Sequence, residues 1–299
     1  MGSWPELGWV EKVWIPLFQV DAFTAVPFAG NPAAVCLLPQ ELPQALMQAI
    51  AAENNLSETA FLLPQGSQGE VPHYGLRWFT PTTEVDLCGH ATLAGAHVLF
   101  TEVHPEAERV AFSTRSGLLQ VRRQGDRLAM DFPARSPEPW PEAKEQVAAA
   151  LGIPPVELYR GDMGVAVLAS AEQVQQVQPD LAQVQALPVP GLIVTASGAA
   201  LGNGPDFVCR VFAPRLGIPE DPVTGSAQCL LMPYWAKRLG RSELQAHQLS
   251  SRGGELWCRD LGSRVEIAGQ AVQVIRGELR LPWNPTEQKT PRICFRGAG

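Results

Sequence analysis

The segment Leu87-Cys-Gly-His-Ala-Thr-Leu-Ala-Gly-Ala-His-Val-Leu-Phe100 decides the fold of this 299-residue chain. From Ala91 to Phe100, a helix would be apolar on nearly every face. A helix that is apolar all round is buried on all sides. A compact domain seldom encloses a helix in this way unless a sheet wraps it. The segment therefore predicts a curled sheet around a central helix.

A second segment of the same kind, Gly225-Ser-Ala-Gln-Cys-Leu-Leu-Met-Pro-Tyr-Trp-Ala-Lys-Arg-Leu-Gly240, lies in the other half of the chain. Pro233 is expected to kink its helix, because proline removes one hydrogen bond and clashes with the preceding turn. Each segment follows a strand-like run and a Phe-x-Pro turn, Phe79-Thr-Pro81 in one half and Phe212-Ala-Pro214 in the other. A duplicated domain, and therefore two similar α+β lobes, is the economical interpretation.

The remaining patterns suggest where each lobe begins and ends. Helical spacing is found at 42–54 and 142–151, and β-rich runs occupy 13–20, 33–38, 57–63, 74–80, 110–131, 165–169, 192–196, 207–212 and 257–281. A proline-rich link covers 133–141. We expect a first lobe at 1–115 and a second lobe at 116–279, with a C-terminal segment, 280–299, that could return to the first lobe. Residues 1–13 look like an extension.

Composition and charge exclude several classes of function. The chain has 23 Lys and Arg residues against 30 Asp and Glu residues, a net charge of −7, and no basic run, so nucleic-acid binding is not expected. The longest uncharged stretch, 181–205, is interrupted by prolines and glycines, so no membrane span is expected. The first ten residues contain no basic residue and do not resemble a secretory signal. The expected location is the cytoplasm.

The starts of the two central helices are candidate anion sites. A helix N-terminus presents unpaired backbone N–H groups and the positive end of the helix dipole. Gly89 and Gly225 allow a ligand to approach the backbone closely. Two such starts, one in each lobe, could hold a carboxylate between the lobes. Ordinary capping, with Ser226 as the cap, is the competing interpretation, and the spacing alone slightly favours it.

Three side chains near these segments suit acid–base chemistry. Glu58 lies between apolar strand residues, where desolvation makes a carboxylate more basic, although an outward-facing strand position or a capping role is the alternative. Asp221 precedes the second central helix, where acidic residues are common because of the helix dipole. His90 is disfavoured as a cation at a helix start, so a neutral ring that donates to an oxyanion is expected.

Two other chemistries are poorly supported. Cys88 and His90 with Asp221 or Glu58 could be proposed as zinc ligands, but their spacing matches no known ligand pattern, and no metal is expected. The six cysteines form no Cys-x-x-Cys pair. Ser226 lacks the Gly-x-Ser-x-Gly elbow of the α/β-hydrolases.

Several motifs in register carry a family resemblance: Asp21-Ala-Phe-Thr, Phe28-Ala-Gly-Asn-Pro, Asn55-Leu-Ser-Glu-Thr-Ala-Phe, Phe79-Thr-Pro, Leu87-Cys-Gly-His-Ala-Thr and Glu220-Asp-Pro-Val-Thr-Gly-Ser-Ala. Over residues 13–281 the chain resembles the PhzF family, the phenazine-biosynthesis-like isomerases of the diaminopimelate-epimerase-like fold. The resemblance implies two similar domains, each a curled mixed sheet around a central buried helix, with the active site in the cleft between them. It also implies that no cofactor or metal is used, and that the protein forms a homodimer.

The resemblance also implies roles for single residues. The family's catalytic glutamate matches Glu58, and the histidine of its Cys-Gly-His-Ala-Thr motif matches His90. Its Asp-Pro-Val-Thr-Gly-Ser motif places Asp221, Gly225 and Ser226 in the site. In phenazine producers the substrate is trans-2,3-dihydro-3-hydroxyanthranilate, and the glutamate moves a hydrogen between ring carbons.

Two positions depart from related patterns. Racemases and epimerases of the wider fold carry a cysteine before each central helix, and here Cys88 and Thr224 occupy those places. Threonine cannot serve as a thiol base, so a two-cysteine racemization is not expected. Gln228 stands where many family members have His or Asn, which leaves the identity of the substrate open.

The sequence therefore predicts a cofactor-independent isomerase that moves a proton between carbons of a small carboxylated substrate. Glu58 is expected to be the general acid and base, with His90, Asp221 and Ser226 positioning the substrate. The N–H groups at Gly89 and Gly225 are expected to hold negative charge. An amino-acid racemase or epimerase is one alternative, and a non-catalytic ligand- or protein-binding member of the family is the other.

Overall fold

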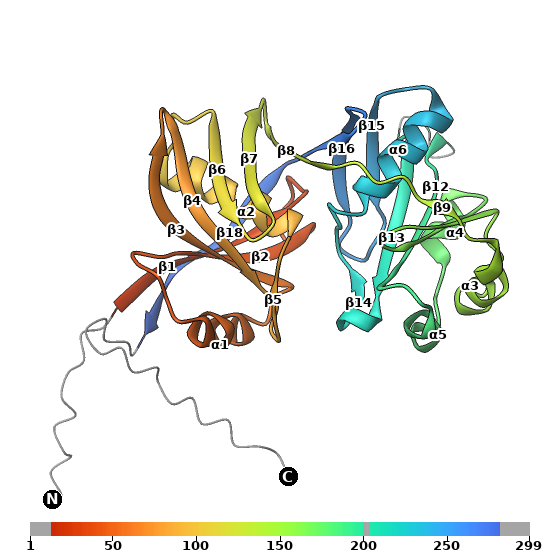
Figure 1. The fold of residues 1–299 in the computed structure, drawn as a ribbon, viewed down its shortest axis with the longest axis horizontal. Coiled ribbons are helices and arrows are strands. Elements are labelled where there is room, and N and C mark those ends of the chain that lie inside the picture. The colour runs from red at the N-terminus through yellow and green to blue at the C-terminus, as the bar shows by residue number, and fades with distance from the viewer. Residues whose placement is uncertain (1–12, 200–201, 203, 282–299) are drawn as a thin grey trace, which may run out of the picture.

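The computed structural model describes residues 13–199, 202 and 204–281 and shows two lobes side by side (Figure 1). The first lobe contains β1 (Val13–Ala22), β2 (Asn31–Leu37), α1 (Gln44–Asn54), β3 (Glu58–Gln68), β4 (Val71–Phe79), β5 (Glu84–Val85), α2 (Gly89–Val98), β6 (Arg109–Thr114), β7 (Gly117–Gln124), β8 (Arg127–Pro133) and β18 (Ala271–Leu281). The second contains β9 (Glu138–Pro139), α3 (Lys144–Leu151), β10 (Glu157–Arg160), β11 (Gly164–Val167), α4 (Ala171–Gln176), α5 (Leu181–Ala186), β12 (Leu192–Ser197), β13 (Phe207–Ala213), β14 (Ile218–Asp221), α6 (Gln228–Leu239), β15 (Glu243–Gln248), β16 (Gly254–Asp260) and β17 (Arg264–Gly269).

The two lobes repeat one topology, which confirms the predicted duplication. In the first lobe, β2 and β3 are parallel, β4 follows antiparallel to β3, and α2 connects β4 to the parallel strand β6. In the second, β11 and β12 are parallel, β13 follows antiparallel to β12, and α6 connects β13 to the parallel strand β15. Each lobe is therefore an α+β unit with one long helix inside its sheet.

The central helix α2 is buried as its composition requires. All ten of its residues are Ala, Gly, His, Thr, Leu or Val, and all except Gly89 and His97 are buried. Small residues allow the sheet to approach: a Cβ atom at Gly95 would lie 3.5 Å from the side chain of Leu62 on β3. A π-helical turn, Leu99–Val103, then continues the helix.

Pro233, where a kink is expected, lies inside α6 and does not end it. The helix runs without a break from Gln228 through Pro233 to Leu239. A proline at this position cannot donate to the carbonyl of Cys229, one turn earlier. The backbone N–H of Arg135 donates to that carbonyl instead, at 2.9 Å, so the group stays satisfied.

Strand pairing places the lobe boundary later than the expected residue 115. Both β7 and β8 continue the sheet of the first lobe, and β8 then pairs antiparallel with β17 of the second lobe. The chain returns to the first lobe with β18, which pairs along the whole of β1, from Val13↔Leu281 to Ala22↔Ala271. The extension at 1–12 and the segment 282–299 lie outside the described residues. Within the described residues, no helix is both long enough and apolar enough to span a membrane.

A phenylalanine from the first lobe is packed into the second. Phe23 follows β1, has a φ of 63°, and is fully buried. A Cβ atom at Gly269 would lie 2.4 Å from its ring, and one at Gly225 would lie 3.4 Å from it. The backbone carbonyl of Phe23 also accepts a hydrogen bond of 2.9 Å from Glu255 N. Glycines of the second lobe therefore form the space that this ring fills.

Phe23→Ala is expected to lower the free energy of unfolding by about 3–5 kcal/mol, because it empties that space. Phe28→Ala is a matched control from the same connection, since Phe28 also has a positive φ, of 71°, but is 79% exposed. Its effect should stay within about 0.5 kcal/mol. Urea unfolding of both variants measures the difference, and equal losses would contradict a packing role for Phe23.

Candidate active site at the junction of the lobes

Glu58 is the first residue of β3 and faces the central helix of its lobe. Side chains alternate along a strand, so Glu58 shares a face with Ala60 and Leu62, which pack in the same core as α2. Phe61 points the other way and packs in the core that includes α1. The carboxylate is thereby carried into the interior, and Glu58 is 8% exposed.

His90 contacts Glu58 from the first turn of α2. Its Nε2 atom lies 3.1 Å from Glu58 Oε2, and its Nδ1 atom lies 3.5 Å from Cys88 Sγ. Burial alone would lower the pKa of His90, but the Cys88 and Glu58 side chains together raise that pKa well above its usual value. The direction of this shift favours an imidazolium, in contrast to the neutral ring expected from the helix dipole. Because burial keeps the Cys88 thiol protonated, the charge that stabilises the imidazolium is that of Glu58.

Cys88 is a buried thiol at the start of α2. Burial is the largest cause of its raised pKa, and the nearby charge of Glu58 adds to it, so the thiol stays protonated. Glu58, Cys88 and His90 each offer a metal-ligand atom, and these atoms lie within 4.8 Å of one another. The thiol contacts Nδ1 of the ring and the carboxylate contacts Nε2, so His90 links the two groups.

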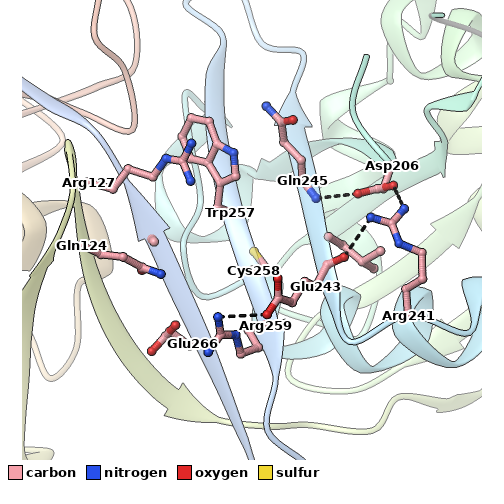
Figure 2. Close-up of a pocket in the computed structure, with 12 residues that line it drawn as sticks. Gln124, Arg127, Asp206, Arg241, Glu243, Gln245, Trp257, Cys258, Arg259 and Glu266 are labelled. Atoms are coloured by element: carbon pink, nitrogen blue, oxygen red, sulfur yellow. Dashed lines mark hydrogen bonds and ion pairs between the residues drawn. The ribbon is translucent and has the colours of Figure 1, made fainter. Parts of the chain in front are cut away.

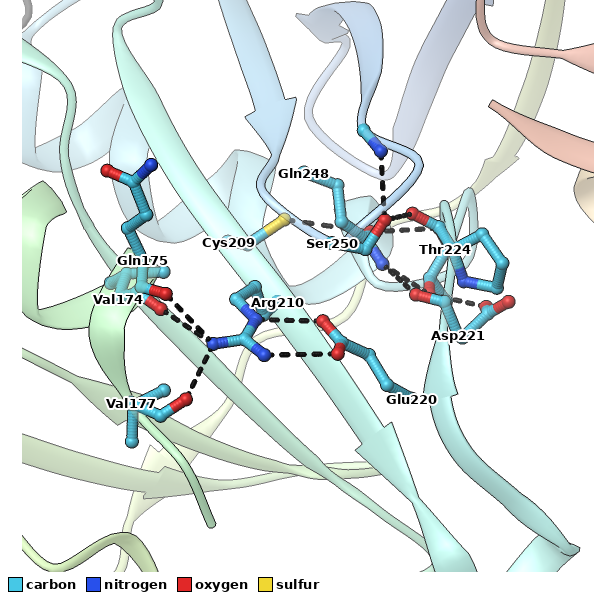
Figure 3. Close-up of polar contacts among 12 residues, drawn as sticks. Val174, Gln175, Val177, Cys209, Arg210, Glu220, Asp221, Thr224, Gln248 and Ser250 are labelled. Atoms are coloured by element: carbon cyan, nitrogen blue, oxygen red, sulfur yellow. Dashed lines mark hydrogen bonds and ion pairs between the residues drawn. The ribbon is translucent and has the colours of Figure 1, made fainter. Parts of the chain in front are cut away.

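Asp221 ends β14 and reaches the junction from the second lobe (Figure 3). The preceding residue, Glu220, points away from the junction and forms a two-point ion pair with Arg210, at 2.8 and 3.0 Å. Asp221 Oδ1 accepts from Asn31 Nδ2 at 2.8 Å, and Oδ2 accepts from Thr224 Oγ1 at 2.5 Å. Burial raises the pKa of Asp221 to about 6, although the charge of His90 and these hydrogen bonds oppose the shift.

The starts of the two central segments meet at this junction. A Cβ atom at Gly89 would lie 3.7 Å from the Cα atom of Gly225. Cys88 precedes α2 and Ala227 precedes α6, and neither supplies a side-chain cap. Ser226 is exposed and is not the cap of α6, so the capping interpretation is not supported. Both first turns thus keep backbone N–H groups that no side chain caps.

The structure brings together five of the six residues that the sequence nominated, whereas the sixth, Ser226, is exposed. Glu58 and His90 come from the first lobe, Asp221 from the second, and Gly89 faces Gly225 across the junction. The sequence analysis missed Asn31, which is fully buried and donates both to Asp221 and to the carbonyl of Val223. Asn31 entered the sequence analysis only as part of the motif Phe28-Ala-Gly-Asn-Pro. Gln248 was also missed, because it lies outside the β-rich runs and motifs that the sequence indicated.

A polar cavity of about 300 Å³ lies elsewhere, over β15, β16 and β17 (Figure 2). Its acidic side chains have partners: Arg241 pairs with Asp206, and Arg259 pairs with Glu243 at 2.9 Å. Glu58, His90 and Asp221 do not line it. The junction residues are closed off by contrast, because Glu58 and His90 are both buried and the two glycines are in contact.

Two curled sheets around uncapped helices, with acid–base side chains where the lobes meet, define an epimerase-like two-domain fold. The family model of the phenazine biosynthesis-like proteins, PhzC-PhzF, matches residues 20–277. The chain belongs to this family.

Relatives and solved structures agree with that assignment. An uncharacterized isomerase of Pseudomonas aeruginosa is 51% identical, over 88% of this chain and 97% of its own length. A human phenazine biosynthesis-like domain-containing protein is 42% identical, over 89% of this chain and 99% of its own. A PhzF-family crystal structure from Enterococcus faecalis is 46% identical, covers 90% of this chain and 100% of its own, and superimposes with a TM-score of 0.84. The family and its relatives support an isomerase- or epimerase-like function.

The raised pKa of Asp221 predicts how stability depends on pH. Folded Asp221 holds its proton up to about pH 6, whereas the unfolded chain releases it near the ordinary value of 3.8. Between these values the folded state binds more protons, so the free energy of unfolding attributable to Asp221 falls as the pH rises. One pKa unit corresponds to about 1.4 kcal/mol, which limits the loss to about 3 kcal/mol.

Urea unfolding of the wild type and of Asp221→Asn between about pH 4 and pH 7 isolates this contribution. The stability of the variant relative to the wild type should rise with pH and level off above about pH 6. A difference that stays constant over this range would show that Asp221 titrates normally in the folded protein.

Proposed function

We propose that this protein is a cofactor-independent isomerase that moves a proton between carbons of a small carboxylated substrate, with Glu58 as the general acid and base. The observation that carries the proposal is the buried contact of 3.1 Å between Glu58 Oε2 and His90 Nε2. A carboxylate fixed in this way, beside uncapped helix starts, is suited to removing a proton from carbon next to a bound carboxylate.

The roles of the other groups follow from their positions. Glu58 accepts a proton from one carbon and returns it to another carbon on the same face. The negative charge that develops on the substrate is stabilised by backbone N–H groups at Gly89 and Gly225 and by the charge of His90. Asp221 holds a polar group of the substrate from the second lobe. A proton shift transfers no electrons, so its balance requires no redox cofactor.

One observation keeps the racemase or epimerase alternative in view. Racemization needs a base on each face of the carbon, and Thr224 occupies the position of the second cysteine. Its hydroxyl, however, donates to Asp221, whose pKa of about 6 suits a second base from the opposite lobe. The intact set of Glu58, His90 and Asp221 weighs against a non-catalytic member of the family, which remains the other alternative because the same groups can bind a ligand without turning it over. We also propose a homodimer in the cytoplasm, as the family resemblance implies.

Glu58→Gln should keep the fold but reduce solvent deuterium incorporation at substrate carbon by at least about 10²-fold, because an amide cannot accept the proton. The substrate is sought first among small carboxylates that stabilise the protein thermally, starting with trans-2,3-dihydro-3-hydroxyanthranilate. Incorporation is then measured by mass spectrometry beside a melting curve.

Glu84→Gln is the matched control for that experiment. Glu84 is another buried glutamate of the first lobe, paired with Arg77 at 2.7 Å and away from the junction residues. This variant should lose stability and keep its exchange rate. Wild-type exchange in a folded Glu58→Gln protein would refute the mechanism and favour the binding-protein alternative.

Cys88→Ala should keep most of the exchange activity. The thiol is neutral because burial raises its pKa, so it is not the proton acceptor. The variant also removes one neighbour of His90, and a modest change in the pH profile is expected. Loss of several orders of magnitude in a folded variant would instead assign the thiol a role as a base and revive the racemase alternative.

A further inference from the structure

The loop that carries Asp221 is held by one buried amide side chain. Gln248 is the last residue of β15 and is 1% exposed. Its Nε2 atom donates to the carbonyl of Asp221 at 2.6 Å and to Thr224 Oγ1 at 3.2 Å. Its Oε1 atom accepts from the backbone N–H of Thr224 at 2.9 Å. The amide therefore bridges both ends of the turn between Asp221 and Thr224 (Figure 3).

These bonds fix the direction of the hydroxyl proton of Thr224. A hydroxyl has one proton to donate. Because Thr224 Oγ1 accepts from Gln248, its own proton is free to be donated to Asp221 Oδ2, which lies 2.5 Å away. The chain from Gln248 through Thr224 to Asp221 thus has one consistent direction, and it ends on a carboxylate oxygen. Hydrogen bonds to a charged acceptor are the stronger kind.

The segment that follows Gln248 reinforces the same turn and ties it to the first lobe. Ser250 Oγ donates to the carbonyl of Pro222 at 2.7 Å. Arg252 donates to the carbonyl of Gly30 at 2.8 Å and to Asp21 at 2.9 Å. Gly30 is followed by Asn31, the other side chain that donates to Asp221. The short connection after β15 therefore supports Asp221 from both lobes.

We propose that Gln248 is a positioning residue, which fixes the orientation and the hydrogen bonding of the Asp221 carboxylate through Thr224. The functional meaning of this proposal rests on the proposed function, in which Asp221 contacts the substrate. The structural part does not, because it concerns only how Asp221 is held. The titratable groups that act on Asp221 are His90 on α2 and Glu58 on β3. Among the described residues, neither of these groups forms a hydrogen bond with Gln248.

The test compares two glutamines on one strand. Gln248→Met removes the bridge, and Gln245→Met is the matched control, because Gln245 also lies on β15 but lines the polar cavity and contacts His247 (Figure 2). The readout is the carboxyl ¹³C titration of Asp221, assigned by its absence in Asp221→Asn. Gln248→Met should raise the proton affinity of Asp221 by up to about tenfold, the effect of losing the hydrogen bond that Thr224 Oγ1 donates to the carboxylate once Gln248 no longer orients it. Gln245→Met should leave it unchanged.

An unchanged titration of Asp221 in folded Gln248→Met would overturn the proposal. If that variant does not fold, the wild type still decides the question. The side-chain amide ¹⁵N resonance of Gln248 should then shift with pH at the midpoint of Asp221, and this shift should vanish in Asp221→Asn. An amide resonance that does not follow Asp221 would also overturn the proposal.

Failure of the proposed function has a different signature. If Asp221→Asn exchanges deuterium at the wild-type rate, Asp221 has no part in the chemistry, yet the effect of Gln248 on its titration would persist. If Asp221 takes part in the chemistry and Gln248 positions it, the pH profile of exchange in Gln248→Met should move in the same direction as the titration of Asp221. A merely structural loss would lower the rate at every pH without moving the profile.

Discussion

Two central helices, each enclosed by its own sheet, begin where the two lobes touch, and this constraint determines where the candidate site lies. Cys88 and Ala227 precede these helices, and neither caps them. Both first turns lie where the lobes touch, with Gly89 against Gly225. The place where both central helices begin is therefore also the place where Glu58, His90 and Asp221 converge. An anionic ligand bound between the lobes would lie near the N-terminal ends of both helices.

Much of the fold was accessible from the sequence, for reasons that concern particular elements. All-round apolar composition identified α2, and the run from Gly225 identified α6. The short helices α4 and α5 were missed, although Ser170 and Asp180 cap them as expected from sequence rules. The lobe boundary was wrong because β7 and β8 resemble any other strands, and only their pairing reveals which sheet they extend.

The sequence predicted the acid–base residues of the candidate site but not the side chains that hold them in place by hydrogen bonds. Ionisable residues in apolar surroundings are visible in a sequence, which is why Glu58 and His90 were found. Their charge states were less accessible: the cation at His90 depends on contacts with Cys88 and Glu58 that only the folded chain provides. Gln248 and Asn31 act through hydrogen bonds to a turn far away in the sequence. The two copies of the repeat have also diverged. In the first lobe, the first residue pair of β2 and β3 is Ala33↔Glu58, whereas in the second lobe the first pair of β11 and β12 is Gly164↔Leu192, which contains no carboxylate.

The return of β18 to the first lobe has a consequence for how the protein is made. Strand β1 leaves the ribosome early, but one of its two neighbours is the last described strand, and the pairing extends from Val13↔Leu281 to Ala22↔Ala271. The first lobe cannot be completed during synthesis, because its closing strand emerges only after the second lobe. Until then β1 presents an open edge, which is where β-proteins are prone to pair with other chains. The late strand β18 therefore covers an edge of the early strand β1.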